Sequence, residues 1–312
     1  AVYRAKTIMK NKNIMNTVLP IIPMILWGSL FPFVKIGYNA FSIDTECIGD
    51  ILMLAAMRFS VCGIIGCIIA FITGAKLEKP IGKNILNLFC VGLFSVVLQY
   101  AFVYIGLTLT NSSKAAILQQ LGPLIYACFS FLFIKSEKFG IYKIFGAVIG
   151  FCGIFIINTR GNMNGISKGD ILILLSSLCT VISLIMSEKT VCDTSPLWVT
   201  GISQFLGGVV LFALASIMGG EIPTFSIYSS AVFAYICFAS TVAYTLFFYV
   251  QKNILLSKLF IIKFAEPFFA CIFSAILLKE NIFQIQYPIA FVLISAGIVL
   301  AYKEDTSREK IQ

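Results

Sequence analysis

Three ionisable side chains stand well inside long apolar runs of this 312-residue sequence: Arg58, Lys263 and Glu266. A charge at the centre of a bilayer costs about 3 kcal/mol on insertion scales, so each is a candidate for binding a solute or coupling its movement. Glu266 lies one helical turn after Lys263 and directly before Pro267. Two interpretations stay open: a carboxylate neutralised by Lys263, or a free site for a cation or a proton.

The two cations also admit two interpretations each. Arg58 could pair with Asp50 or Glu46 near the outer end of its run, or hold a carboxylate or phosphate of a substrate in a bidentate fashion. Lys263 could reach the headgroups with its long stem, or face a substrate. A water-filled cavity that contains both Arg58 and Glu266 would suit a zwitterion.

Aromatic and amide side chains supply the remaining candidates for substrate contact. Trp27, Tyr100 and Tyr244 offer aromatic faces for a cation or an apolar group. Gln119 and Gln120 stand in an apolar run, where amides facing lipid would stay unsatisfied; they line a cavity or hydrogen-bond between helices. Each proline of the pair Pro123 and Pro267 predicts a helix break, and the two breaks are candidates for gating elements.

Other chemistries lack their residues. The sequence contains no histidine, and its ten cysteines show no ligand or disulfide spacing, so we expect neither a metal nor a cofactor. No phosphate-binding GxxxxGK[ST] loop is present, and nothing indicates nucleic acid. A membrane-embedded enzyme would need a nucleophile with its base or a metal cluster, so the sequence does not predict an enzyme.

The elements that must position these residues are membrane helices. Apolar residues make up 59% of the chain, charged residues 12%, and the mean hydropathy is +0.96. A span needs roughly 20 apolar residues. The expected spans are residues 18–38, 51–73, 84–107, 115–134, 140–158, 169–187, 196–218, 228–250, 259–278 and 284–302. We therefore predict an all-α integral membrane protein with ten transmembrane helices.

Basic residues gather in alternate loops, beginning with the N-terminal segment. By the positive-inside rule both termini are expected in the cytoplasm of a multi-pass protein of the plasma (inner) membrane. The small residues Gly146, Gly150 and Gly153 form a close-packing stripe in the fifth span, which predicts a contact with another helix or within a homodimer.

The sequence also repeats itself at a constant offset of 144 residues, which matches Tyr100 with Tyr244 and Pro123 with Pro267. Each half would hold five spans, an odd number, so the second half would enter the membrane inverted. The expected domains are residues 1–160 and 161–312, two inverted five-helix repeats around a central cavity. Such repeats are the architecture of alternating access.

Several short motifs follow this plan in order. They are Trp27-Gly28-Ser29, Arg58-Phe59, Pro123 followed by Glu137, and Pro267 followed by Lys279-Glu280. In these motifs and their spacing the chain resembles the drug/metabolite transporter (DMT) superfamily, EamA type. The resemblance implies a ten-helix bundle with a cavity lined by spans one to four and six to nine, and members that export amino acids, drugs and other metabolites or import nutrients.

The sequence thus predicts a secondary transporter that exports a small zwitterionic or cationic, amino-acid-like metabolite by alternating access. An uptake carrier for a quaternary amine or a vitamin is the alternative, and a channel is less favoured because no ring of like residues is present. The expected partners are a small-molecule substrate, the lipid bilayer, protons and a second copy of the chain.

Overall fold

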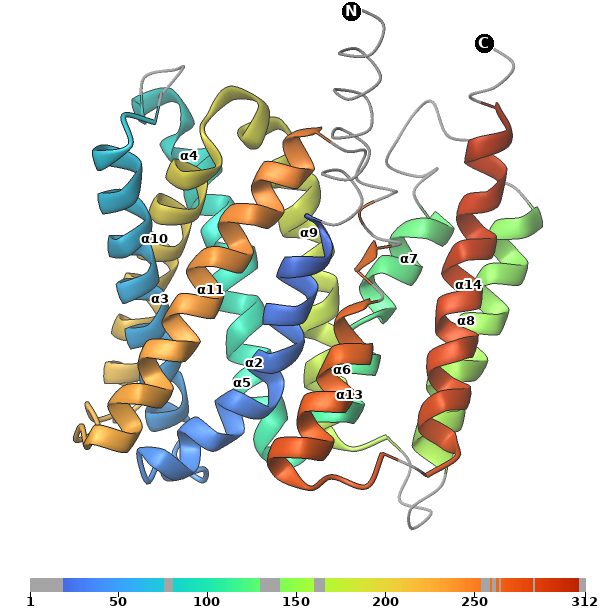
Figure 1. The fold of residues 1–312 in the computed structure, drawn as a ribbon, viewed down its shortest axis with the longest axis horizontal. Coiled ribbons are helices and arrows are strands. Elements are labelled where there is room, and N and C mark those ends of the chain that lie inside the picture. Colours follow the sequence, from blue (N-terminus) through green and yellow to red (C-terminus); the bar gives the residue numbers. More distant parts are fainter. Residues whose placement is uncertain are drawn as a thin grey trace, which may run out of the picture.

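The computed structural model describes residues 19–75, 81–129, 141–159, 166–253, 259, 262–263, 265–282 and 284–308. These residues form helices joined by short connections (Figure 1). The helices are α2 (Ile21–Ala40), α3 (Ile48–Ile72), α4 (Ile81–Gly92), η1 (Leu93–Leu98), α5 (Gln99–Leu109), α6 (Ser112–Leu118), α7 (Leu121–Phe129), α8 (Ile141–Thr159), α9 (Lys168–Asp193), α10 (Pro196–Ile217), α11 (Ile227–Asn253), α13 (Ala265–Leu278) and α14 (Gln286–Arg308).

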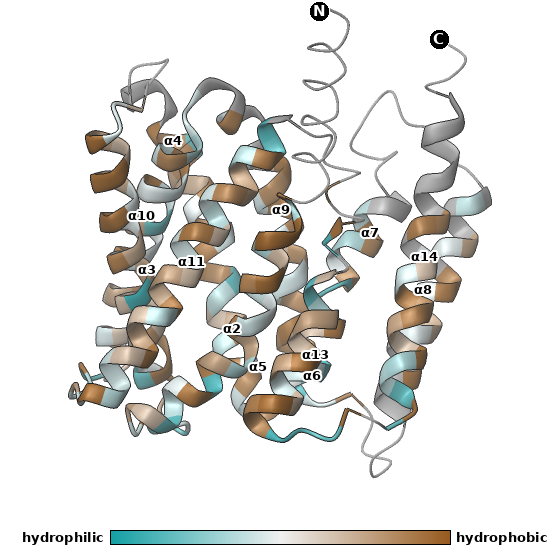
Figure 2. Cartoon of the chain, viewed as in Figure 1, coloured by the Kyte–Doolittle hydropathy of each residue, from teal (hydrophilic) through white to brown (hydrophobic). Residues whose placement is uncertain are grey.

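Length and composition suit a membrane. Among the described residues six helices are long and apolar enough to cross a bilayer, and Ala265–Leu278 and Gln286–Gly297 form shorter apolar helices. Hydrophobic residues also cover much of the outside of the bundle (Figure 2), as lipid contact requires. The prediction of an all-α membrane protein is confirmed, whereas the number of ten spans and their inverted arrangement stay predictions.

Two of the expected spans are interrupted near their beginning. The fourth span consists of α6, which ends at Leu118, and α7, which begins at Leu121. In the ninth span Lys263 stands in a turn, and α13 begins at Ala265.

Pro123 and Pro267 each occupy the third position of the helix that follows the break. A proline ring clashes with the carbonyl of the fourth residue before it, which is Gln119 for Pro123 and Lys263 for Pro267. The preceding helical turns therefore end at Gln119 and Lys263, about one turn before the prolines. The prolines stand in the first turn of the next helix, where a missing N–H costs nothing.

The third span runs without interruption through α4, η1 and α5, but η1 is a π-helix. A π-turn widens a helix locally and is frequent at functional sites. Leu93–Leu98 carries Ser95, and Gln99 follows directly at the start of α5. Sequence patterns did not predict this irregularity.

Small residues allow the closest helix contacts. The most extensive contacts join α3 with α10 and α8 with α14. A Cβ atom on Gly66 would lie 2.9 Å from the Cα of Gly201, and one on Gly297 would lie 2.8 Å from the backbone nitrogen of Gly150. The stripe that includes Gly150 and Gly153 therefore packs within the chain, against α14, which is the helix-contact interpretation of that stripe.

One end of the bundle is tied together by polar contacts. Glu280, just after α13, accepts hydrogen bonds from the backbone N–H groups of Ser112 (3.0 Å) and Ser113 (3.1 Å) and from the Ser113 hydroxyl (2.6 Å). Beside it, Lys114 forms an ion pair with Asp170 at 2.8 Å. This end lies opposite the C-terminal end of α14 (Figure 1).

Candidate functional site

The bundle encloses a cavity of about 60 Å³, measured as the space open to the centres of water molecules. One water needs about 10–15 Å³ on this measure, so several waters or one small solute fit. The lining is drawn from α2, η1, α3, α5, α9, α11, α13 and the two helix breaks. It comprises Trp27, Leu30, Phe31, Val34, Arg58, Ser95, Gln99, Tyr100, Val103, Tyr104, Leu107, Gln119, Thr180, Ser183, Leu184, Tyr244, Phe247, Phe248, Lys263 and Glu266.

Arg58, in the middle of α3, is 1% exposed. Its Nε donates to the Ser240 hydroxyl at 2.8 Å, and its Nη1 donates to the Tyr104 hydroxyl at 2.9 Å. The guanidinium carbon lies 4.6 Å from the ring centre of Phe59 and 5.1 Å from that of Tyr100, within the range of cation–π attraction. All these partners are neutral.

Of the two interpretations of Arg58, the ion pair with Asp50 or Glu46 is not formed in the structure. Asp50 instead accepts a hydrogen bond from the backbone N–H of Glu221 at 2.8 Å, and Glu46 is exposed. Asp50 lies in the first turn of α3, two turns from Arg58, and each finds its partner on another element. Among the described residues no carboxylate forms an ion pair with Arg58, and its Nη2 has no hydrogen-bond partner.

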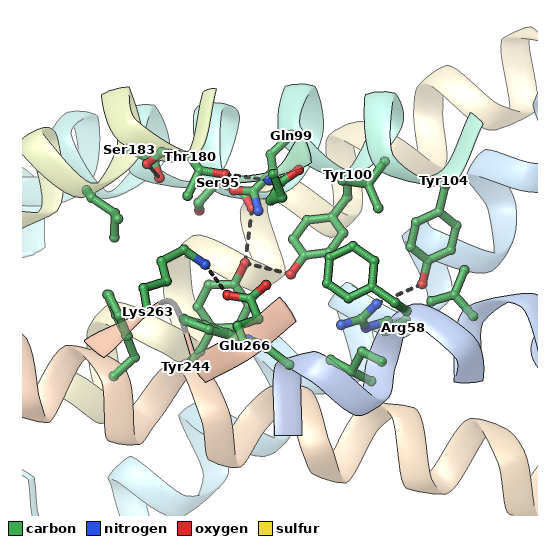
Figure 3. A pocket seen from close by; sticks show the side chains of 18 of the residues that line it. Arg58, Ser95, Gln99, Tyr100, Tyr104, Thr180, Ser183, Tyr244, Lys263 and Glu266 are labelled. Carbon is green, nitrogen blue, oxygen red and sulfur yellow. Dashed lines mark hydrogen bonds and ion pairs between the residues drawn. The ribbon is translucent and has the colours of Figure 1, made fainter. Parts of the chain in front are cut away.

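Lys263 and Glu266 form a buried ion pair across the break before α13. Each residue is 4% exposed, so Lys263 does not extend to the headgroups. The Lys263 ammonium also lies 4.9 Å from the ring centre of Trp27. The contact required by the first interpretation of Glu266, neutralisation by Lys263, is thus present, while both side chains still face the cavity (Figure 3).

The motif Trp27-Gly28-Ser29 lies where α2 packs against α13, next to the Lys263–Glu266 ion pair. A Cβ on Gly28 would lie 2.8 Å from the Glu266 carbonyl oxygen and 2.9 Å from the backbone nitrogen of Ala270, so only glycine lets α2 approach α13 this closely. Ser29 shares a 2.7 Å hydrogen bond with the Tyr235 hydroxyl and so joins α2 to α11. Trp27, between the two, faces the cavity, and its Nε1 is unpartnered.

Tyr100 and Tyr244, matched by the sequence repeat, contact each other. The Tyr244 hydroxyl donates to the Tyr100 hydroxyl at 3.0 Å and also lies 3.3 Å from the Ser95 carbonyl oxygen (Figure 3). Tyr244 further packs edge-on against Trp27, with 5.2 Å between ring centres. These aromatic groups separate Arg58 from the Lys263–Glu266 pair.

Gln119 and Gln120 occupy different environments. Gln119 lines the cavity, donates to the Thr180 hydroxyl at 3.1 Å and accepts from Ser176 at 2.7 Å. Gln120 is buried outside the lining; its amide nitrogen lies 3.4 Å from the Ala116 carbonyl oxygen. The structure therefore places Gln119 at the cavity and Gln120 behind it.

Four polar lining residues were not among the sequence candidates: Ser95, Gln99, Thr180 and Ser183. Ser95 and Gln99 are four residues apart in an apolar span, and Thr180 and Ser183 are three apart in another, so each pair lies on one face of its helix. That spacing, read together with neighbouring tyrosines, could have identified them. Pro123 and Pro267 do not line the cavity.

A bundle of apolar helices around a buried cavity with fixed charges and aromatic walls defines a polytopic membrane transporter. The model of the EamA-like transporter family matches residues 16–159 and again residues 167–303. The chain belongs to this family, within the DMT superfamily, and it is a transporter and not an enzyme.

Relatives span kingdoms. The uncharacterized inner membrane transporter YedA of Escherichia coli is 25% identical over 282 residues, covering 88% of this chain and 87% of its own. A chloroplastic WAT1-related protein of Arabidopsis thaliana is 26% identical, covering 90% of this chain and 68% of its own. A crystal structure with 16% identity superposes with a TM-score of 0.65 over 92% of this chain and 96% of that one, so the fold is shared.

Proposed function

We propose that this protein is a secondary transporter that moves a small zwitterionic metabolite, amino-acid-like in size, across the plasma membrane by alternating access. The observation that carries the proposal is the composition of the buried cavity: a cation, an ion pair and aromatic walls, supplied by elements from both parts of the sequence. Fixed charges at this depth are costly unless they face a solute or each other.

Alternating access requires two halves that can exchange roles, and the contacts support residues 1–160 and 161–312 as inverted repeats. In a two-fold arrangement, matched elements meet at the axis. The second span packs along the seventh (α3 with α10), the fifth along the tenth (α8 with α14), and Tyr100 bonds with its match 144 residues later. The family model also matches each part once.

The broken helices add a second line of support. Spans four and nine are interrupted at Gln119 and at Lys263, positions that the 144-residue offset matches. Discontinuous helices in corresponding positions of two repeats commonly carry the substrate and ion sites of transporters. Both breaks contribute a side chain to the cavity.

A zwitterion suits the cavity better than a cation does. Glu266 already binds Lys263 through one carboxylate oxygen, whereas the buried Nη2 of Arg58 has no hydrogen-bond partner among the described residues and would gain one from a substrate carboxylate. We further propose export with proton exchange through Glu266, which would release Lys263 when protonated. Both termini lie in the cytoplasm under this proposal.

Counterflow in proteoliposomes tests the proposal. Vesicles loaded with an unlabelled amino acid should accumulate the labelled form transiently and saturably, and empty vesicles should not. A panel of amino acids, quaternary amines and vitamins distinguishes the zwitterion from the alternative uptake substrates. Glu266→Gln should reduce counterflow, and the matched control Glu221→Gln, an exposed acid in the connection between α10 and α11, should not.

Other outcomes would overturn the proposal. Flux that rises linearly with concentration and shows no counterflow would indicate a channel. Counterflow restricted to quaternary amines or vitamins would support the uptake carrier instead. An unchanged rate with and without a pH gradient would remove the proton from the mechanism and leave exchange or facilitated diffusion.

A further inference from the structure

The charges that line the cavity do not balance. Lys263 and Glu266 neutralise each other in an ion pair, and Arg58 is the remaining charged residue of the described lining. The lining therefore carries one net positive charge. The nearest groups to the guanidinium are two hydroxyls and the rings of Phe59 and Tyr100, none of which is an anion.

A buried, unbalanced guanidinium is unusual. Arginine is almost never fully buried unless it is paired, because desolvation of the charge costs several kcal/mol. Two hydrogen bonds and cation–π contacts offset part of that cost for Arg58, yet its Nη2, itself buried, has no hydrogen-bond partner among the residues that the structure describes. One edge of the guanidinium therefore lacks an acceptor.

The two other atoms of the described lining without a hydrogen-bond partner can both donate a hydrogen bond. The indole Nε1 of Trp27 can only donate, and the Ser95 hydroxyl can also donate. Neither atom has a hydrogen-bond partner within the described parts of the chain. By contrast one oxygen of the Glu266 carboxylate, the anionic acceptor of the lining, is already bound by Lys263. The unpartnered donors thus favour an anionic oxygen group over an ammonium group.

We infer that the carboxylate of the solute is the counter-ion of Arg58 and that the amino group is dispensable, so that the cavity binds small monocarboxylates with an apolar body. This inference rests on the proposed function and narrows its substrate class. Arg58 sets the specificity through a charge-assisted hydrogen bond from Nη2, and the solute neutralises the lining. Leucine, valine and phenylalanine side chains supply the walls for the body.

Charge also discriminates carboxylate from phosphate. A phosphate monoester carries about −1.5 to −2 at neutral pH, which exceeds the single positive charge of the lining. A carboxylate carries one negative charge and matches it. In this binding mode the carboxylate pairs with Arg58, and Lys263 keeps Glu266 as its partner.

The test uses one apolar body with different head groups: isocaproate, isocaproamide, isohexylamine, isohexyl phosphate and leucine. Binding to the full-length wild-type protein is measured by thermal stabilisation and by calorimetry. Isocaproate should bind at least as tightly as leucine, and the amide, the amine and the phosphate should each bind about tenfold more weakly or not at all.

Variants assign the effect to Arg58. Arg58→Gln should abolish stabilisation by isocaproate, and Arg58→Lys, which keeps the charge but loses the fixed donor, should retain part of it. Lys252→Gln removes an exposed positive charge from the end of α11 and serves as the matched control, with no expected change. Circular dichroism checks that each variant is folded.

The results separate this inference from the proposed function. Carboxylate binding that depends on Arg58, without counterflow, would retain the inference and reject the transport proposal. Counterflow of leucine with no binding of isocaproate, or equal binding of acid and amide, would reject the inference and retain transport. No stabilisation of the wild type by any carboxylate of the panel would also overturn it.

Discussion

At the scale of single residues, the cavity shows how the cost of buried charge is distributed. Lys263 and Glu266 satisfy each other, whereas Arg58 relies on Ser240, Tyr104 and aromatic faces. Removing one partner of a buried ion pair lowers the stability of the protein, because the remaining ion stays desolvated. The pair and the lone cation should therefore respond differently to mutation.

Glu266→Gln should lower the stability of the protein by about 3 kcal/mol, because it leaves the Lys263 ammonium buried and unpaired. The double variant Lys263→Met with Glu266→Gln should regain most of that loss. Thermal unfolding followed by intrinsic fluorescence measures both. Equal loss in the single and double variants would mean that the ion pair does not hold α13 in place.

Tyr244→Phe should lower stability by about 1 kcal/mol, since it removes the hydroxyl that bonds with the Tyr100 hydroxyl and lies 3.3 Å from the Ser95 carbonyl oxygen. Tyr228→Phe, at an exposed position of α11, is the control and should change nothing. The melting temperatures of the two variants measure the difference. Equal melting temperatures would contradict the prediction.

At the scale of elements, the sequence predicted which segments are helical and apolar, but not where those helices are interrupted. Hydropathy identified the apolar runs, and the internal repeat identified the two matched prolines. The break positions depend on which carbonyl a proline obstructs, and the π-turn of Leu93–Leu98 depends on packing; neither leaves a periodic signal. The hydrogen bond from Arg58 to Ser240 joins residues 182 positions apart in the chain, and no local sequence pattern encodes such a contact.

Gly28→Ala should strongly reduce counterflow, because the added methyl group would meet the backbone of α13 at 2.8–2.9 Å and displace Glu266. Gly37→Ala, on the same helix, meets its nearest neighbours at 3.5 and 3.6 Å and should be tolerated. Counterflow rates normalised to the amount of reconstituted protein provide the comparison. Equal rates for both variants would show that α2 can move away from α13 without consequence.

At the scale of the whole molecule, the polar contacts at one end hold different segments together. Glu280 joins the segment after α13 to the start of α6, and Lys114 joins α6 to Asp170 at the start of α9. Such contacts must break if this end opens during transport.

Glu280→Gln should speed hydrogen exchange of the backbone amides of Ser112 and Ser113, because a neutral amide accepts more weakly than a carboxylate. Exchange followed by mass spectrometry of peptides covering α6 measures the change. Glu46→Gln, at an exposed position, should leave exchange in α6 as it is. Unchanged exchange in the first variant would show that these amides are protected by other means.

The π-turn of Leu93–Leu98 has a consequence for how the chain tolerates the loss of a residue. A π-turn contains one residue more than an α-turn, so deleting Val97 would convert it to α-helix and leave α4 and α5 facing as before. In a regular helix such as α11 a deletion rotates everything beyond it by about 100°. Deleting Ala239 should therefore turn Tyr244 away from Tyr100, whereas deleting Val97 should keep them together. The helix formed by α4, η1 and α5 should therefore tolerate a one-residue deletion that α11 should not.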